Sequence, residues 1–285
     1  MPGRSPTAIH GVGTMLESDL LALSDANLAE SHREFARFHP EGLVQERKGL
    51  LLTRGAHEHP GLNFAMRVGP ETPPPREVLT RAQRVFARGC NGFAVRARQH
   101  LDADLIRFMR TGNRFNGGLT VGMVRQGALP EPKVSRTVQV KPVTDEDSGR
   151  IFAQVAGAAF ATEGLSREVS RSVFSNVRCL LAPYLHPVIA YVDDKPVSVT
   201  LALLCHGAAG IYWVGTVREA RGQGLAGMVL RAAHNWACDH GARAVVVQCA
   251  PKHQTLYERH GYRELTHYPW FIVRIPPVRK VPSPP

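Results

Sequence analysis

The second half of the chain alternates short apolar runs with longer segments of helical periodicity, and this alternation restricts the fold more than any other feature. Runs of about four to eight apolar residues between turn signals are typical of strands. Longer stretches with apolar residues three or four positions apart are typical of helices that pack on a sheet. The pattern predicts an α/β domain. Its expected strands are 138–143, 188–192, 197–204, 211–217, 244–248 and 263–275, and its expected helices are 145–160, 166–180, 222–240 and 253–260.

The chain is long enough for two domains of ordinary size. It has 285 residues, of which 44% are apolar and 21% charged, so we expect a packed core rather than disorder. Residues 127–136 are rich in proline and polar side chains, which is typical of a linker. We therefore expect one domain at residues 1–128 and a second at 137–275, with a loose first dozen residues and a mobile tail at 276–285.

The formal net charge of +11 is compatible with an acidic partner, either a nucleic acid or a phosphorylated cofactor. The sequence contains no dense Lys/Arg run and no alternation of basic and aromatic residues, so we expect no nucleic-acid partner. Its apolar runs are too short to cross a bilayer, and no apolar stretch follows Arg4. These features predict a soluble cytoplasmic protein with no membrane partner.

The five cysteines do not form a recognisable metal or redox motif. Their number is odd and no pair has C-x-x-C spacing, so we expect reduced thiols. His234 and Cys238 would share one helix face, but His240 falls off that face and no further ligand cluster completes a set. The sequence predicts no metal site.

A glycine-rich segment between the strand 211–217 and the helix 222–240 is suited to binding an anion. Glycines let the backbone turn tightly and approach a ligand without a Cβ atom in the way. The start of a helix also leaves backbone N–H groups unpaired and carries partial positive charge, which suits a pyrophosphate. The segment reads Arg221-Gly222-Gln223-Gly224-Leu225-Ala226-Gly227.

Two other phosphate-binding motifs fit this segment less well. Its glycines match G-x-G-x-x-G, but three residues separate them from the strand, and the next strand ends in Gln248 and Cys249 where a ribose-binding acid is needed. A Walker-type loop is excluded because no Lys-Ser/Thr pair follows the glycines.

The segment resembles motif A of the GNAT acyltransferase superfamily, [Q/R]-x-x-G-x-[G/A], at Arg221, Gly224 and Ala226. The preceding run 214–222 is similar to the V-x-T-x-P-x-x-R-G run of the family, with Arg218 in place of the frequent proline. The resemblance implies acetyl-CoA, or another acyl-CoA, as the cofactor, with a splayed strand alongside its pantetheine arm. It implies cofactor contacts at Val214, Gly215, Thr216, Arg221, Gly222, Gln223, Gly224, Leu225, Ala226 and Gly227.

A second signature of the family, [L/V]-Y-x-x-x-G-[F/Y], is similar to residues 256–262. A phenol with a pKa of about 10 stays protonated at neutral pH and can donate a proton to a leaving thiolate. The resemblance therefore implies that Tyr257 is the general acid. By location, Glu163, His206 and Cys249 are candidates for the base that deprotonates the amine, but each also has an ordinary structural explanation, and water can do the same work.

The first half of the chain repeats the order of elements without the chemical groups. Residues 61–68 read like residues 210–217, yet the segment Pro73–Pro75 stands where the glycines should be and has no N–H groups to offer. Phe108 stands four residues before a glycine, where the tyrosine is expected. We infer two GNAT-like domains in tandem, each a mixed, mostly antiparallel sheet flanked by helices, with the splayed-strand cofactor cleft in the second.

These observations predict an N-acyltransferase that moves an acetyl group from acetyl-CoA to a primary amine in a ternary complex. The acceptor is a small molecule or a peptide amine, and the degenerate first domain would help to shape its pocket. The alternative is a non-catalytic CoA-binding regulator. The sequence does not reveal the oligomeric state, for which a homodimer is one candidate.

Overall fold

The computed structural model describes most of the chain. The expected loose N-terminus, the tail and most of the expected linker lie outside the residues it describes. The described ranges are 15–55, 59–87, 90–111, 116–130 and 138–275.

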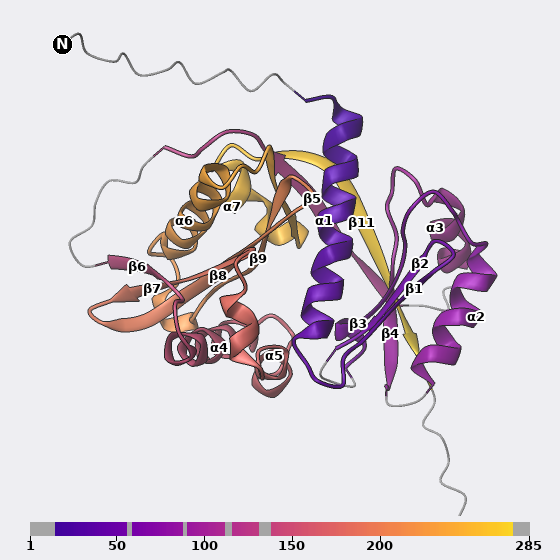
Figure 1. Cartoon of the computed structure of the whole chain (residues 1–285), viewed down its shortest axis with the longest axis horizontal. Helices are drawn as coiled ribbons and strands as arrows, with labels where there is room; N and C mark the ends of the chain where they lie inside the picture. Colours follow the sequence, from indigo (N-terminus) through magenta and orange to yellow (C-terminus); the bar gives the residue numbers. More distant parts are fainter. Residues whose placement is uncertain (1–14, 56–58, 88–89, 112–115, 131–137, 276–285) are drawn as a thin grey trace, which may run out of the picture.

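The described residues form one mixed sheet of eleven strands, in the order β1-β2-β3-β4-β11-β5-β10-β9-β8-β7-β6 (Figure 1). Neighbouring strands are antiparallel except for β3 with β4 and β9 with β10, which are parallel. The predicted fold class, a mostly antiparallel sheet flanked by helices, is confirmed. The strands are β1 (Leu43–Arg47), β2 (Leu50–Arg54), β3 (Asn63–Arg67), β4 (Gly92–Arg96), β5 (Asn116–Arg125), β6 (Val138–Pro142), β7 (Leu185–Val192), β8 (Lys195–Cys205), β9 (Ala208–Thr216), β10 (Ala244–Cys249) and β11 (Arg263–Arg274).

The two halves of the chain exchange strands at the centre of the sheet. β11, the last strand, lies between β4 and β5 of the first half, and β5 lies between β11 and β10 of the second half. Each half therefore completes its hydrogen bonding with a strand from the other half. The division into domains 1–128 and 137–275 stays a prediction, and the sheet itself runs through both.

Helices cover both faces of the sheet. Apolar clusters place α2 and α3 over the first half and α6 and α7 over the second half on one face. α1 and α4 pack on the opposite face. The helices are α1 (Glu17–Arg37), α2 (Pro75–Phe86), α3 (Ala103–Arg110), α4 (Glu146–Phe160), α5 (Arg167–Val173), α6 (Leu225–Asp239) and α7 (Gln254–Glu258).

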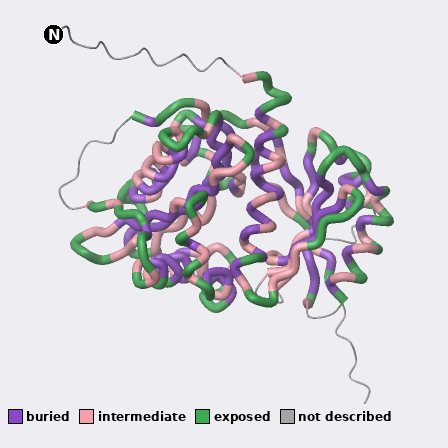
Figure 2. Tube along the Cα trace, in the orientation of Figure 1, coloured by how far each residue is buried: buried purple, intermediate pink, exposed green. Residues whose placement is uncertain are grey.

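α1 was not predicted from the sequence, although it spans the junction between the halves. Its buried face carries polar side chains, which weaken the apolar periodicity. The Asn27 amide donates to the Leu203 carbonyl of β8 (3.0 Å), and the Ser24 hydroxyl lies 2.8 Å from the Tyr268 hydroxyl of β11. Figure 2 shows buried positions along the side of α1 that meets the sheet. The helix, which belongs to the first half, is thus joined by hydrogen bonds to two strands of the second half.

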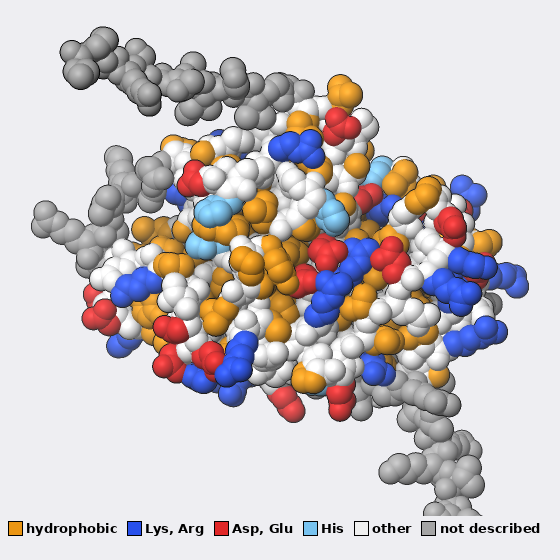
Figure 3. Space-filling view, viewed as in Figure 1, with side chains coloured by type: hydrophobic (Ala, Val, Ile, Leu, Met, Phe, Trp, Pro, Cys, Tyr) orange, Lys and Arg blue, Asp and Glu red, His pale blue; other side chains and the backbone are white. Residues whose placement is uncertain are grey.

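The outer side of α1 is charged, as expected for an exposed helix face. Arg33 pairs with Glu30 (2.8 Å) and with Glu46 of β1 (2.6 Å). Figure 3 shows acidic and basic side chains side by side on the face that α1 fronts. Exposed pairs of this kind contribute at most about 1 kcal/mol each, so the buried polar face holds α1 in place more strongly.

Two predicted helices differ from the observed ones. The helix expected at 166–180 stops at Val173 and is followed by a 3₁₀ turn at Val177–Leu181, because Ser175 and Asn176 favour turns over helix interiors. The helix expected at 222–240 begins only at Leu225. None of the helices in the described ranges is both long enough and apolar enough to span a membrane.

Candidate active site

The parallel strands β9 and β10 separate part-way along their length. They pair from Ala208 with Ala244 to Ile211 with Val247, and no further. β9 continues to Thr216, while β10 turns to pair only with β5. We call this opening beyond Ile211 and Val247 the strand split. It is the splayed strand that the sequence resemblance implied.

β9 also carries a β-bulge in its pairing with β8, just beyond the point where the strand split begins. Leu201 of β8 faces Tyr212 and Val199 faces Gly215, so two residues of β9 stand opposite one residue of β8. One of them, Trp213, has φ of 56°, a left-handed conformation that costs about 1–2 kcal/mol for a residue with a side chain. Its indole ring packs edge-on against Phe160 and Phe174, with ring centroids 4.8 and 4.9 Å away. These contacts hold the bulge.

The glycine-rich segment presents free backbone donors beside the strand split. Gly222 and Gly224 have φ of 81° and 75°, and α6 begins directly after them. The first N–H groups of α6 that bond within the protein are those of Gly227 and Met228, both to the Gly224 carbonyl. Among the described residues, the N–H groups of 222–226 have no partner. We call these five groups the amide cradle.

Open space lies over the amide cradle. A Cβ atom added at Gly222 or Gly224 would have no neighbour within 4 Å. Residues 221–224 are exposed, whereas the Leu225 side chain is buried in the core. Gly227 lies close to the His260 ring, which a Cβ atom would approach to 2.8 Å. The backbone of this segment is thus the part that a ligand can reach.

The Arg221 side chain links two elements next to the amide cradle. Its guanidinium donates to the carbonyls of Thr216 and Ala159 (both 3.1 Å) and to the Thr162 hydroxyl (2.5 Å). It therefore ties the end of β9 to the end of α4. Contact between Arg221 and a cofactor phosphate stays a prediction.

The three predicted residues on β9 face in different directions. Val214 packs into the core under α6. A Cβ atom at Gly215 would lie 2.9 Å from Ala159 and Phe160, so Gly215 faces α4 and offers only its backbone to a ligand at the cradle. The Thr216 hydroxyl lies 2.8 Å from the Ser198 hydroxyl.

Tyr257 lies on α7 with a buried ring and an unused hydroxyl. Its side chain belongs to the core cluster under α6, and its hydroxyl bonds to none of the described residues. Burial, followed by the nearby Cys249, raises the pKa of Tyr257, so the phenol keeps its proton at neutral pH. Tyr262, five residues on, instead bonds to His234 Nδ1 (2.7 Å).

The three candidate bases are poorly suited to that role. Burial is the largest influence on Glu163 and would raise its pKa, but hydrogen bonds from Lys252 and His253 outweigh it and lower the pKa. Burial, followed by Glu258, raises the pKa of Cys249 to about 11, so its thiol stays protonated.

His206 lies in the turn before β9, at the opposite end of that strand from the cradle. A strand of this length spans about 25 Å, so His206 is far from any ligand held at the cradle.

Glu163 instead bridges the two sides of the strand split. It lies 2.5 Å from Lys252 and 3.3 Å from His253, which follow β10, and 3.9 Å from Arg221, which follows β9.

The histidine and cysteine group on α6 has structural partners. His234 Nδ1 bonds to the Tyr262 hydroxyl, and His234 Nε2 lies 2.9 Å from the Gly127 carbonyl. His240 is exposed and stacks on Trp236. Across the described ranges, no group of three or more His, Cys, Asp or Glu side chains is arranged to hold a metal ion.

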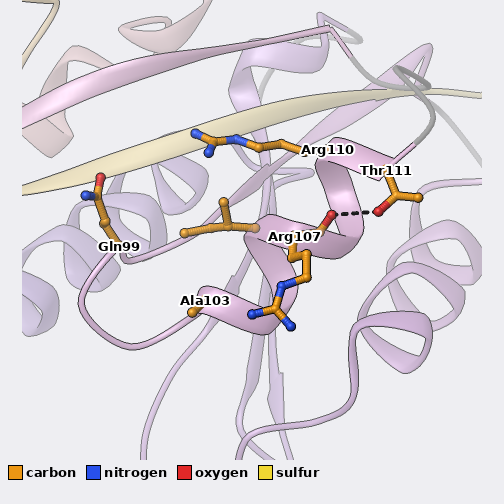
Figure 4. A pocket seen from close by; sticks show the side chains of 6 residues that line it. Gln99, Ala103, Arg107, Arg110 and Thr111 are labelled. Atoms are coloured by element: carbon orange, nitrogen blue, oxygen red, sulfur yellow. Dashed lines mark hydrogen bonds between the residues drawn. The ribbon is translucent and has the colours of Figure 1, made fainter.

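The first half of the chain has no equivalent of the amide cradle. Pro74 and Pro75 start α2, so the donors that glycines supply in α6 are missing there. Phe108 on α3 packs against the core. A hollow of about 650 Å³ lies beside α3, far from the strand split, and the guanidinium groups of Arg107 and Arg110 point away from each other at its edge (Figure 4).

Two polar residues near the strand split were missed by the sequence analysis. Arg96 of β4 and Gln248 of β10 both have buried polar atoms without a hydrogen-bond partner among the described residues. No motif marks them, because the strand exchange that brings β4 toward β10 is not visible in the sequence.

The comparison with known families identifies the second half. Residues 183–264 match the acetyltransferase (GNAT) domain model. This part of the chain is therefore similar to a GNAT domain. This domain includes the strand split, the amide cradle and Tyr257, and it supports acyl transfer as the general class of activity. Comparison with curated protein sequences gave no match.

Solved structures share the GNAT fold over nearly the whole chain. A GCN5-related N-acetyltransferase from Kribbella flavida is 17% identical, with a TM-score of 0.65 over 88% of this chain and 94% of that one. One from Sphaerobacter thermophilus is also 17% identical, with a TM-score of 0.59 over 94% and 96%. A tandem GNAT protein from the clavulanic acid biosynthesis pathway is 13% identical, with a TM-score of 0.57 over 92% and 95%.

The two buried tyrosines of the second motif should differ in their effect on stability. Tyr257→Phe removes a hydroxyl without a partner, so the free energy of unfolding should change by less than about 0.5 kcal/mol. Tyr262→Phe leaves His234 Nδ1 unpaired and should cost about 1–3 kcal/mol. Urea unfolding of both variants measures this difference. An equal loss in both would mean that the Tyr257 hydroxyl has a structural partner.

Proposed function

We propose that this protein is an N-acyltransferase that moves an acetyl group from acetyl-CoA to a primary amine by direct attack in a ternary complex. The observation that carries the proposal is the amide cradle next to the strand split. Five unpaired N–H groups at a helix start form an anion site of the kind that binds a pyrophosphate. Their open surroundings leave room for the ligand.

The strand split would hold the arm that carries the thioester. Beyond Ile211, the edge of β9 that faces β10 has lost its ladder partner, so its backbone groups can bond to the amides of a pantetheine arm. The cofactor would thus be held mainly by main-chain groups, which is compatible with the absence of a dense basic cluster.

Tyr257 would supply the proton for the leaving group. The amine nitrogen attacks the thioester carbonyl carbon, and the C–S bond breaks as the tetrahedral intermediate collapses to the amide. The sulfur takes the phenol proton of Tyr257. Burial disfavours the resulting phenolate of Tyr257. The attacking nitrogen releases one proton as the amide forms, and this proton restores the phenol. The balance is one amine and one thioester to one amide and one thiol.

None of the three candidate bases is well placed to deprotonate the acceptor. Glu163 is tied to Lys252 and His253, Cys249 stays protonated, and His206 lies at the other end of β9. We therefore propose that water carries this proton away. The acceptor would be a small molecule or a peptide amine, and the first half of the chain would shape its pocket through α1 and the exchanged strands.

Substitutions at the two ends of α6 should separate cofactor binding from stability. Gly224 and Gly241 both have positive φ, 75° and 86°, and open space around a Cβ atom. Alanine at either position should cost about 1–2 kcal/mol of stability through backbone strain. Only Gly224→Ala should weaken CoA binding, by about tenfold or more, because its methyl group enters the cradle. Isothermal titration with CoA measures this, and equal binding by the two variants would contradict the cradle.

Removing the Tyr257 hydroxyl should slow acyl transfer without weakening the binding of CoA. Tyr257→Phe should lower turnover by about 100-fold, the lower end of the range for general acid catalysis, with CoA affinity unchanged. A thiol-release assay with acetyl-CoA and a panel of amines measures it. Unchanged turnover would remove Tyr257 from the mechanism. Tight acetyl-CoA binding with no transfer to any amine would favour the non-catalytic regulator.

A further inference from the structure

Arg96 is a recessed arginine without an acidic partner. Arg96 itself is half-buried. Two buried arginines of the first half are neutralised: Arg67 bonds to Asp104 (2.7 and 2.9 Å), and Arg98 bonds to Asp102 (2.9 Å). Arg96 instead has one hydrogen bond, from Nη1 to the Thr120 hydroxyl (2.9 Å), and no ion pair with any described residue. Its Nε is buried and unpaired.

The surroundings of Arg96 supply no negative charge. The Arg96 guanidinium lies 5.5 Å from the centre of the Phe64 ring. The His32 ring stacks on the same Phe64 ring, with 3.9 Å between the two ring centres. Burial, followed by the charge of Arg96, lowers the pKa of His32 well below its usual range, so this imidazole is neutral. Burial also raises the pKa of Tyr212 and of Tyr268, so both phenols are neutral.

A positive charge that is partly withdrawn from water without a counter-charge is costly, which is why proteins normally pair such groups. Burial lowers the pKa of Arg96 to about 10, which still leaves it charged at neutral pH. The guanidinium has five N–H donors, and four of them have no partner among the described residues. Its planar, forked arrangement matches the two oxygens of a carboxylate.

Gln248 adds neutral polar groups on the strand beside Thr120, the residue that Arg96 contacts. It is the first residue of β10 beyond the last paired position, Val247, so it stands at the strand split. Both the oxygen and the nitrogen of its side-chain amide are buried without a partner. It pairs with Gly122 of β5, two residues from Thr120, which places Gln248 and Thr120 diagonally across neighbouring strands, about 7–8 Å apart.

These groups lie on the opposite face of the sheet from the amide cradle. Val247 and Cys249 point into the core under α6, so Gln248 between them points to the face that α1 covers. Val246 shares that face with Leu20 and Leu23 of α1. A thioester held in the strand split would therefore have the cradle on one side and Arg96 with Gln248 on the other.

We propose that Arg96 binds a carboxylate of the acceptor, with Gln248 as a second contact, so that the acceptor is a primary amine that also carries a carboxylate. This inference rests on the proposed acyl transfer at the strand split. One guanidinium supplies one positive charge, which matches a carboxylate better than a phosphate dianion. The Arg96 guanidinium contacts Thr120 of β5, which lies one to two strand spacings, or about 5–10 Å, from the strand split. An amino acid of moderate length spans that distance.

The test compares matched acceptors and matched variants. Acetyl-CoA thiol release is measured with β-alanine, 4-aminobutyrate and 6-aminohexanoate, each against its own carboxamide. The proteins are the wild type, Arg96→Gln, Arg96→Lys and, as a control, Arg110→Gln on the exposed face of α3. The wild type and the control should prefer at least one carboxylate over its amide by about 10–100-fold in kcat/KM.

Arg96→Gln should lose this preference, mostly through the KM for the acceptor, while the KM for acetyl-CoA is unchanged. Arg96→Lys should keep the charge without the planar fork and retain part of the preference. Equal rates for acids and amides in the wild type, or a preference that survives in Arg96→Gln, would overturn the assignment.

A binding measurement separates this inference from the proposed function. Isothermal titration of 6-aminohexanoate and its amide into the protein, with and without CoA, needs no turnover. Tighter binding of the acid that disappears in Arg96→Gln supports the site even if acyl transfer fails. Equal or absent binding of both compounds to protein that binds CoA contradicts it. Failure to bind CoA at all would count against the proposed function alone.

Discussion

The separation of β9 from β10 beyond Ile211 and Val247 is the constraint on which the rest of the site depends. Two parallel strands that stay paired leave no free backbone for a ligand, because each N–H and C=O group is used in the ladder. Here the ladder ends early, and β10 beyond Val247 keeps only its pairing with β5. The same departure places the start of α6, with its unpaired amides, beside the opening.

The exchange of strands explains why a first half without a cradle is still part of the protein. β5 supplies the neighbour that β10 keeps after it leaves β9, and β11 closes the first half in return. α1 then covers the junction through buried polar contacts such as Asn27 with Tyr212 (2.7 Å). The first half therefore holds the strand split open, and it brings Arg96 near the opening from β4.

Local patterns predicted the parts of the site that local chemistry determines. The glycines of the cradle and the position of Tyr257 follow from spacing within two short motifs, and the strand and helix order of the second half followed from periodicity. α1 was missed because Ser24, Asn27 and His32 stand on its buried side. The interleaving of β5 and β11 depends on pairing between residues at least 120 apart, and so Arg96 and Gln248 could not be associated with the site from sequence.

The most direct test of the account is a crystal structure with bound CoA. The account predicts the diphosphate within hydrogen-bond distance of the N–H groups of residues 222–226, with the pantetheine arm between β9 and β10. A diphosphate bound elsewhere, with those amides facing solvent or bonded within the protein, would contradict it.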